Sequence, residues 1–84
     1  MNRYELTARF DSRQGFCGKA IVVEDGGNKK LYSYNTLVAE TFKNNSEAKV
    51  YNTQSQTTVR HVMEFLKQNG FRAESKKQIE KDYK

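Results

Sequence analysis

The single histidine of the chain, His61, is the first residue to consider for chemistry, because an imidazole can act as a general base near neutral pH. Such a base needs a nucleophile within hydrogen-bonding distance, and the candidates are Cys17 and Ser55. No sequence signature links either residue to His61. We interpret His61 as a histidine at the border of the apolar face of a packed helix, and we expect no enzymatic activity.

Metal and phosphate sites have equally little support in the sequence. One histidine and one cysteine among scattered carboxylates match no ligand spacing of a metal site. The glycine-rich stretch Gly15–Gly18 lacks the lysine–serine ending with which a phosphate loop holds phosphate and metal. It fits a bulge or the entry to a strand instead. We therefore expect neither a cofactor nor a metal ion.

Basic and aromatic side chains are the stronger candidates, and they indicate binding. The chain has 15 Lys and Arg against 10 Asp and Glu, a formal charge of +5, which favours nucleic acid or an acidic protein surface as partner. The C-terminal tail carries many of these cations, but Glu74, Glu80 and Asp82 lie among them and also fit a solvated helix with internal ion pairs. Tyrosines on a sheet could stack on unpaired bases, although no recognisable RNA-binding signature surrounds them. The expected binding residues are Tyr32, Tyr34, Tyr51, Lys30, Arg13 and Arg60.

One long amphipathic helix is predicted from Ser55 to Gly70, and the other elements are predicted to pack against it. At about 100° per residue, its apolar and polar side chains separate onto opposite sides. Ser55 or Thr57 can cap its first amides, and Gly70 can end it in the left-handed conformation. The apolar side holds Val59, Val62, Met63, Phe65 and Leu66, and the polar side holds Arg60, Glu64, Lys67 and Gln68.

Strands are predicted before this helix from apolar patterning. Tyr4–Phe10 alternates strictly, and Gly18–Glu24 is a nearly continuous apolar run that indicates an inner strand covered at least in part on both faces. The turn formers Asp25–Asn28 join that strand to Lys30–Tyr34 in a hairpin. Asn35–Phe42 fits either a helical turn or a strand, and its β-branched content favours a strand. The remaining predicted elements are a strand at Ala48–Asn52 and a short helix at Lys76–Tyr83 with Ser75 as its N-cap.

The predicted fold class is α+β: an antiparallel meander of four to five strands packed by one amphipathic helix, with a short C-terminal helix, in a single domain of residues 1–84. If Leu31 points at the helix, Tyr32 and Tyr34 point away from it, so the second sheet face is expected to be a binding platform or half of an oligomer interface. We expect no membrane association and a cytoplasmic location. The sequence has no run of 18 apolar residues and no signal peptide, and its lone cysteine suits a reducing compartment.

Three segments are distinctive when taken together: Phe10–Ala20, Leu31–Ala39, and Ser55–Val62 with Phe65–Phe71. They resemble a small, uncharacterised domain family of phages and mobile elements of gut bacteria. In that family the first segment reads as Phe-Tyr-Gly-Lys-Ala, and here Cys17 stands where the second aromatic is usual. The resemblance covers most of the chain and carries over no catalytic or binding residues.

What the resemblance implies is a context. Small phage-borne proteins without an active site often antagonise host defence by stoichiometric binding, and anti-CRISPR proteins are the best-known class. We therefore expect an anti-CRISPR inhibitor that binds a Cas effector complex in the host bacterial cell and covers a surface that the nuclease needs. The net charge argues against DNA mimicry, which requires an acidic surface. The alternatives are a nucleic-acid-binding accessory protein, with RNA or DNA as partner, and a sponge for a nucleotide second messenger at the interface of a homo-oligomer.

Overall fold

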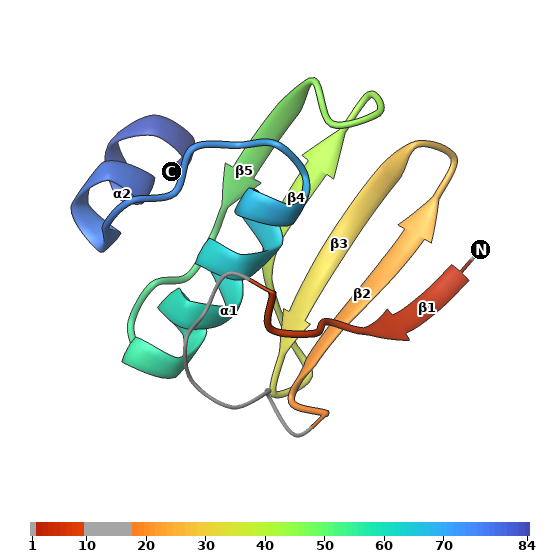
Figure 1. Cartoon of the computed structure of the whole chain (residues 1–84), viewed down its shortest axis with the longest axis horizontal. Helices are drawn as coiled ribbons and strands as arrows, with labels where there is room; N and C mark the ends of the chain where they lie inside the picture. The colour runs from red at the N-terminus through yellow and green to blue at the C-terminus, as the bar shows by residue number, and fades with distance from the viewer. Residues whose placement is uncertain (1, 10–17) are drawn as a thin grey trace.

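Within residues 2–9 and 18–84, which the computed structural model describes, the chain forms one five-stranded antiparallel sheet and two helices (Figure 1). The strands lie in the sheet in their chain order, each pairing with the next. This confirms the predicted α+β meander. The elements are β1 (Asn2–Glu5), β2 (Ala20–Asp25), β3 (Asn28–Ser33), β4 (Thr36–Phe42), β5 (Glu47–Val50), α1 (Gln56–Gln68) and α2 (Lys76–Tyr83).

Tight turns connect the inner strands. Gly26 and Gly27 join β2 to β3 with φ angles of 58° and 88°, in the left-handed region that glycine enters without strain. A Cβ on Gly27 would lie 2.7 Å from Oδ1 of Asn44, so the turn after β4 packs closely on this glycine. The segment Asn35–Phe42, which fitted either a helical turn or a strand, contains the strand β4, and β4 pairs with β3 and β5. The hairpin and the fourth strand are therefore confirmed.

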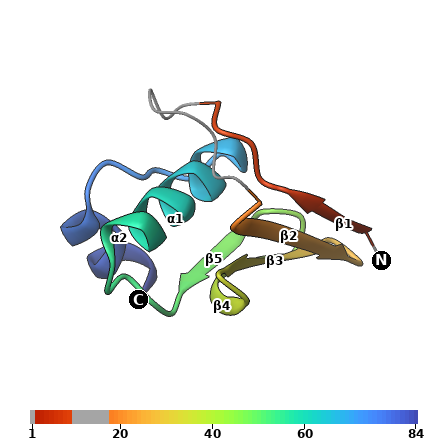
Figure 2. The ribbon, with the colours of Figure 1, turned by 90° about the horizontal axis from the view of Figure 1, so that it is seen from below.

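Both helices pack on the same face of the sheet, as Figure 2 shows from below. Val22, Leu31 and Val50 point from the strands into one core cluster, which also contains Phe65 of α1 and Ile79 of α2. Where β3 pairs with β4, β4 has one extra residue, Val38, and this bulge shifts the register. Val38 and the next residue, Ala39, are both buried. Within the described residues, helices therefore cover one side of the sheet. The prediction that β2 is covered at least in part on both faces is met in this weaker form, because Ile21 and Val23 on its other face are half-buried.

The ends of α1 follow the predicted capping. Oγ of Ser55 accepts a hydrogen bond from the Thr58 amide at 3.0 Å. At the other end Gly70 has a φ of 84°, and its amide donates to the Lys67 carbonyl at 3.2 Å. The Phe71 amide donates to the Leu66 carbonyl at 2.9 Å, which completes a Schellman motif. Phe71 then packs against the core.

The buried side of α1 is wider than the predicted apolar arc. Glu64, predicted on the polar side, is only 2 % exposed and accepts a hydrogen bond from Gln68 Nε2 at 2.6 Å. The same Gln68 group donates to the backbone carbonyl of Thr7 at 2.5 Å, because the chain after β1 runs beside the helix. His61, predicted at the border of the apolar face, is 1 % exposed. The helical wheel was wrong for these two residues, since it could not include a second covering segment.

The first strand is shorter than the alternation predicted. β1 ends at Glu5, and one further backbone bond, from the Leu6 amide to the Ala20 carbonyl at 2.9 Å, closes its pairing with β2. Beyond that point the chain leaves the sheet towards α1, and Ala8 packs on the core from there. The predicted end of this strand at Phe10 lies outside the described residues.

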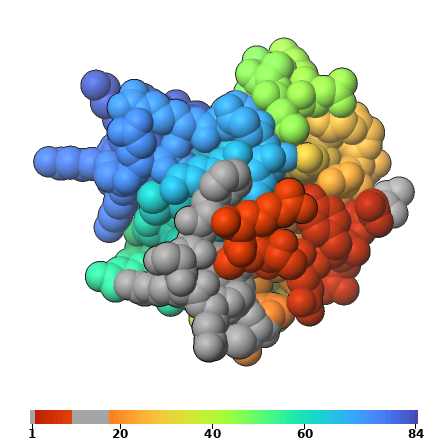
Figure 3. All heavy atoms as spheres, viewed as in Figure 1, coloured from red at the N-terminus to blue at the C-terminus, as the bar shows by residue number. Residues whose placement is uncertain are grey.

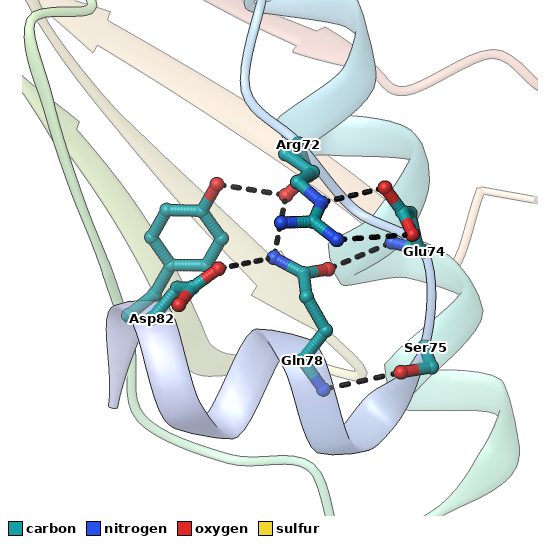
Figure 4. A network of polar contacts seen from close by, with 6 residues as sticks. Arg72, Glu74, Ser75, Gln78 and Asp82 are labelled. Atoms are coloured by element: carbon teal, nitrogen blue, oxygen red, sulfur yellow. Dashed lines mark hydrogen bonds and ion pairs between the residues drawn. The ribbon is translucent and has the colours of Figure 1, made fainter.

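The C-terminal helix occupies the predicted range and is held by local polar contacts, which Figure 4 shows in close-up. Oγ of Ser75 accepts a hydrogen bond from the Gln78 amide at 3.1 Å and caps the helix. Arg72 pairs with Glu74 at 2.5 Å, and the Tyr83 hydroxyl donates to the Arg72 carbonyl at 2.7 Å. These contacts fit the interpretation of the tail as a solvated, ion-paired helix. Neither described helix is long and apolar enough to cross a membrane.

Candidate interaction surface on the open sheet face

The side of the sheet that faces away from α1 and α2 is covered by neither of these helices. Successive side chains of a strand point to opposite faces, so the residues that alternate with the core residues lie on this side. The register places them opposite one another across neighbouring strands. We call this surface the open sheet face, and its residues are Arg3, Glu5, Ile21, Val23, Asp25, Asn28, Lys30, Tyr32, Leu37, Glu40, Phe42, Glu47 and Lys49.

The centre of the open sheet face is apolar. Tyr32 of β3 lies opposite Ile21 of β2 and Leu37 of β4. These three side chains are half-buried, shielded by one another rather than by a helix. A hollow of about 480 Å³ opens here, lined by Tyr32 and Ile21 together with Val23, Arg3 and Asn35. The sheet therefore offers a shallow apolar depression with one cation at its margin.

Charges of both signs surround this depression. Lys30 lies opposite Glu40 on β4, and Glu40 lies opposite Lys49 on β5. Arg3 and Glu5 alternate on β1 at the other edge. The expected excess of positive charge is therefore not concentrated on the open sheet face, where cations and carboxylates are close to balance.

Three of the residues predicted from sequence to bind a partner lie together on this side. Lys30 and Tyr32 belong to β3, and Tyr51 follows β5. The Tyr51 hydroxyl donates to Oε1 of Glu40 at 3.3 Å, which places its ring beside the Lys30–Glu40 pair. Partial burial and the neighbouring Glu40 carboxylate raise the pKa of Tyr51, so its hydroxyl stays protonated as a donor.

Tyr34 does not share the face of Tyr32, contrary to the prediction from strand alternation. β3 ends at Ser33, and Tyr34 with Asn35 forms a tight turn in which both φ angles are positive, 51° and 66°. The Tyr34 ring lies 5.9 Å from the His61 ring on the helix side, and the Lys19 ammonium lies 5.8 Å from its centre. Strand alternation stops where the turn begins, so it could not place this side chain.

Arg60 also lies away from the open sheet face. Arg60 lies on α1 and lines a separate hollow of about 520 Å³ with Lys76 and the start of the helix around Ser55. That hollow is on the helix side of the molecule. Arg13, like Cys17, lies outside the described residues. The structure thus brings together Lys30, Tyr32 and Tyr51 and separates Tyr34 and Arg60 from them.

The hydrogen-bond partner of His61 was not predicted from the sequence. Nδ1 of His61 lies 2.7 Å from Oγ of Ser33, a buried serine at the end of β3. Burial lowers the pKa of His61, and the positive charge of Arg60 lowers it further, so the imidazole is kept neutral. Ser33 was recognisable in the sequence only as a polar residue at a core-facing position, two residues after Leu31. Ser55, the nucleophile candidate considered with Cys17, serves as the helix cap instead.

Among residues 2–9 and 18–84, no group of three or more His, Cys, Asp and Glu side chains is arranged to hold a metal ion. The described carboxylates on the open sheet face are set beside cations across the strands rather than converging on one point. The chemistry available on this face is therefore recognition through an apolar centre, tyrosine hydroxyls and paired charges.

A model of a family of unknown function, DUF8033, matches residues 4–81. The match spans nearly the whole chain, and the chain belongs to this family. No curated protein and no solved structure matches it. The family agrees with the expectation of a small uncharacterised domain.

Proposed function

We propose that this member of a family of unknown function is a stoichiometric binding protein that docks on another protein through the open sheet face. The observation that carries the proposal is the apolar depression around Tyr32, which no described helix covers although the opposite face of the same sheet is packed by two. Half-buried apolar side chains framed by charges resemble the core and rim of a protein interface. The molecule measures 29 × 28 × 21 Å, so its broad side is of the order of the ~800 Å² that each partner contributes to an interface of standard size.

The balance of charges favours a protein as the partner over a nucleic acid. A surface that follows a phosphate backbone needs cations in excess, because each phosphate contact is made by a positive charge. Here Lys30 and Lys49 both lie opposite Glu40, which would oppose a phosphate at the same place. A protein surface with charges of both signs can match this pattern instead.

The narrower form of the proposal is that the bound protein belongs to a host defence system and that binding inhibits it, as in anti-CRISPR proteins. Its support is the resemblance of the sequence to small proteins of phages and mobile elements, together with the small size of the domain. Inhibition would then be by occlusion: the open sheet face covers a surface that a Cas effector nuclease uses for target DNA or for its own assembly.

A phage-protection assay with a matched pair of tyrosine variants tests this proposal. Bacteria with an active CRISPR system would express the protein and be challenged with a phage that the system targets. We expect wild type to restore plaques. Tyr32→Ala should bind the effector about tenfold more weakly, a loss of about 1.4 kcal/mol typical of an interface aromatic. Tyr34→Ala, the same substitution away from the open sheet face, should protect like wild type.

Two results would count against the proposal. If Tyr32→Ala protects as well as wild type while Tyr34→Ala does not, the binding surface is on the helix side. If no tested defence system is inhibited, the narrower form fails. Gel-shift titration over a salt series would then examine the nucleic-acid alternative: affinity that falls steeply with salt would support it, and no shift at low salt would exclude it.

A further inference from the structure

The outer edge of β1 carries backbone groups that face away from the sheet. The Leu6 amide donates to the Ala20 carbonyl, so the even-numbered residues of this segment direct their amides and carbonyls towards β2. The intervening residues, Arg3 and Glu5, must then direct theirs outwards. Within the described residues β1 has a strand neighbour on one side only, and Figure 3 shows its atoms, in red, at the surface.

The two edges of the sheet differ in how they are protected. At the far edge, α2 packs beside β5. At the β1 edge, three features that discourage strand pairing are absent: Asn2–Glu5 contains no proline and no lysine, and its register with β2 runs without a bulge. All four of its residues are exposed. An edge of this kind is a template for a further strand.

We propose that two copies of this chain pair through their β1 strands, antiparallel and centred on Tyr4, to form a two-fold symmetric dimer with a continuous sheet. The charge pattern of the strand selects this register. Centring on Tyr4 places Arg3 of each copy opposite Glu5 of the other, and both residues direct their backbone groups outwards, so each pair can exchange both backbone hydrogen bonds. Opposite charges on a symmetric edge make it complementary to itself.

The neighbouring registers are disfavoured. A shift that keeps the same backbone groups facing each other places either Arg3 opposite Arg3 or Glu5 opposite Glu5, and like charges directly opposite destabilise a strand pair. A shift by one residue places Arg3 and Glu5 of one copy, whose backbone amides and carbonyls point outwards, opposite even-numbered residues of the other copy. The backbone groups of those even-numbered residues already form hydrogen bonds with β2. The sequence Asn2–Glu5 therefore specifies one register among those that the edge allows.

The symmetry has a consequence for the open sheet face. A two-fold axis perpendicular to the sheet keeps both pairs of helices on one side and both open sheet faces on the other. Arg3, which lines the hollow beside Tyr32, would then lie next to Glu5 of the second copy. The dimer thus joins two hollows into one longer surface. The proposed dimer does not depend on the proposed function and is tested separately from that function.

Charge reversal at the strand pair tests the dimer in the full chain. Sedimentation equilibrium over a concentration series would give the dimer dissociation constant of wild type, Glu5→Arg, Arg3→Glu and the double variant Arg3→Glu/Glu5→Arg. We expect wild type to dimerise, each single variant to raise the dissociation constant by at least about tenfold, and the double variant to recover it, because the swap restores both charge pairs. Thermal melting confirms that each variant is folded.

A cysteine cross-link provides a second readout that does not depend on affinity. In a Cys17→Ser background, Tyr4→Cys brings two cysteines together at the non-hydrogen-bonded position of the pair, where Cα atoms about 4.5 Å apart suit a disulfide. We expect oxidation to yield a covalent dimer from Tyr4→Cys and none from Lys49→Cys, an exposed position on the opposite edge strand. The dimer is wrong if wild type stays monomeric at all concentrations and Tyr4→Cys does not cross-link. It is equally wrong if Glu5→Arg dimerises like wild type.

Discussion

At the scale of single residues, the pairing of His61 with Ser33 shows how a polar group can be part of the core. The imidazole is 1 % exposed, and Oγ of Ser33 lies 2.7 Å from its Nδ1. A buried polar group costs little when its hydrogen bonds are made, and costs much more when it must carry a charge. The fold therefore holds His61 in its neutral form, which couples the stability of the domain to pH.

We predict that the domain loses stability as the pH falls below about 6.5. Burial lowers the pKa of His61 below its ordinary value of 6.5, so between that value and the folded-state pKa the unfolded chain binds more protons than the folded chain. The free energy of unfolding must then decrease with decreasing pH through this range. Urea unfolding at pH 7.5 and 5.5 should give a lower midpoint at pH 5.5.

His61→Gln is the matched control, since it is neutral at both pH values and can still hydrogen-bond to Ser33. We expect this variant to have the same midpoint at pH 7.5 and 5.5, because the chain has no other histidine. A pH dependence of the same size in His61→Gln, or a wild type that is more stable at pH 5.5, would show that His61 is not the titrating group.

At the scale of elements, α1 determines how the sheet is used. Its apolar side chains Val62, Phe65 and Leu66 are fully buried against the strands, and this covers one sheet face. The second helix extends the same layer through Ile79 rather than crossing to the other side. The open sheet face exists because both helices are on one side of a single sheet.

We predict that Leu66→Asp unfolds the domain. Leu66 is 0 % exposed, and a carboxylate at its position would be buried without a partner. Leu66→Ala should leave a folded protein that is less stable by about 2–5 kcal/mol, out of a total of about 5–15 kcal/mol for a small domain. Thermal melting followed by circular dichroism measures both variants.

Gln56→Asp introduces the same carboxylate at an exposed position in the first turn of the same helix, where the helix dipole favours it. It should melt at or slightly above the wild-type temperature. If Leu66→Asp melts like Gln56→Asp, the assignment of the buried side of α1 is incorrect.

Patterns local in sequence predicted much of the fold, whereas contacts distant in sequence account for the errors. The caps at Ser55 and Gly70 and the bounds of α2 depend on neighbouring residues, and they are confirmed. The burial of Glu64 depends on Gln68 and on the segment after β1, which lies fifty and more residues earlier in the chain. A helical wheel represents one helix and cannot show a contact with that segment.

The candidate site shows the same division. Strand alternation placed Lys30 and Tyr32 on the face away from the helix, as the register requires. It misplaced Tyr34, because a bulky residue rarely takes a positive φ and nothing in the sequence marked the turn there. The partner of His61 was equally hidden, since Ser33 is 28 residues away.

At the scale of the whole molecule, the domain has one sheet face that is packed by helices and one that we propose receives a partner. The apolar depression around Tyr32, the flanking pairs of opposite charge and the outer edge of β1, which pairs with no second described strand, all lie on or beside that second face. Pairing of two copies through β1 would double its extent. A partner protein of sufficient size would contact both copies across one surface.

Site-specific photo-cross-linking in the host cell tests this claim most directly, because it reports which side of the molecule touches a partner. A benzophenone amino acid would replace Tyr32 on the open sheet face or, in a matched variant, Lys77, an exposed residue of α2. After illumination, denaturing gels of nuclease-treated lysates should show an adduct with a second protein from position 32 and none from position 77. An adduct from position 77 alone would contradict the account.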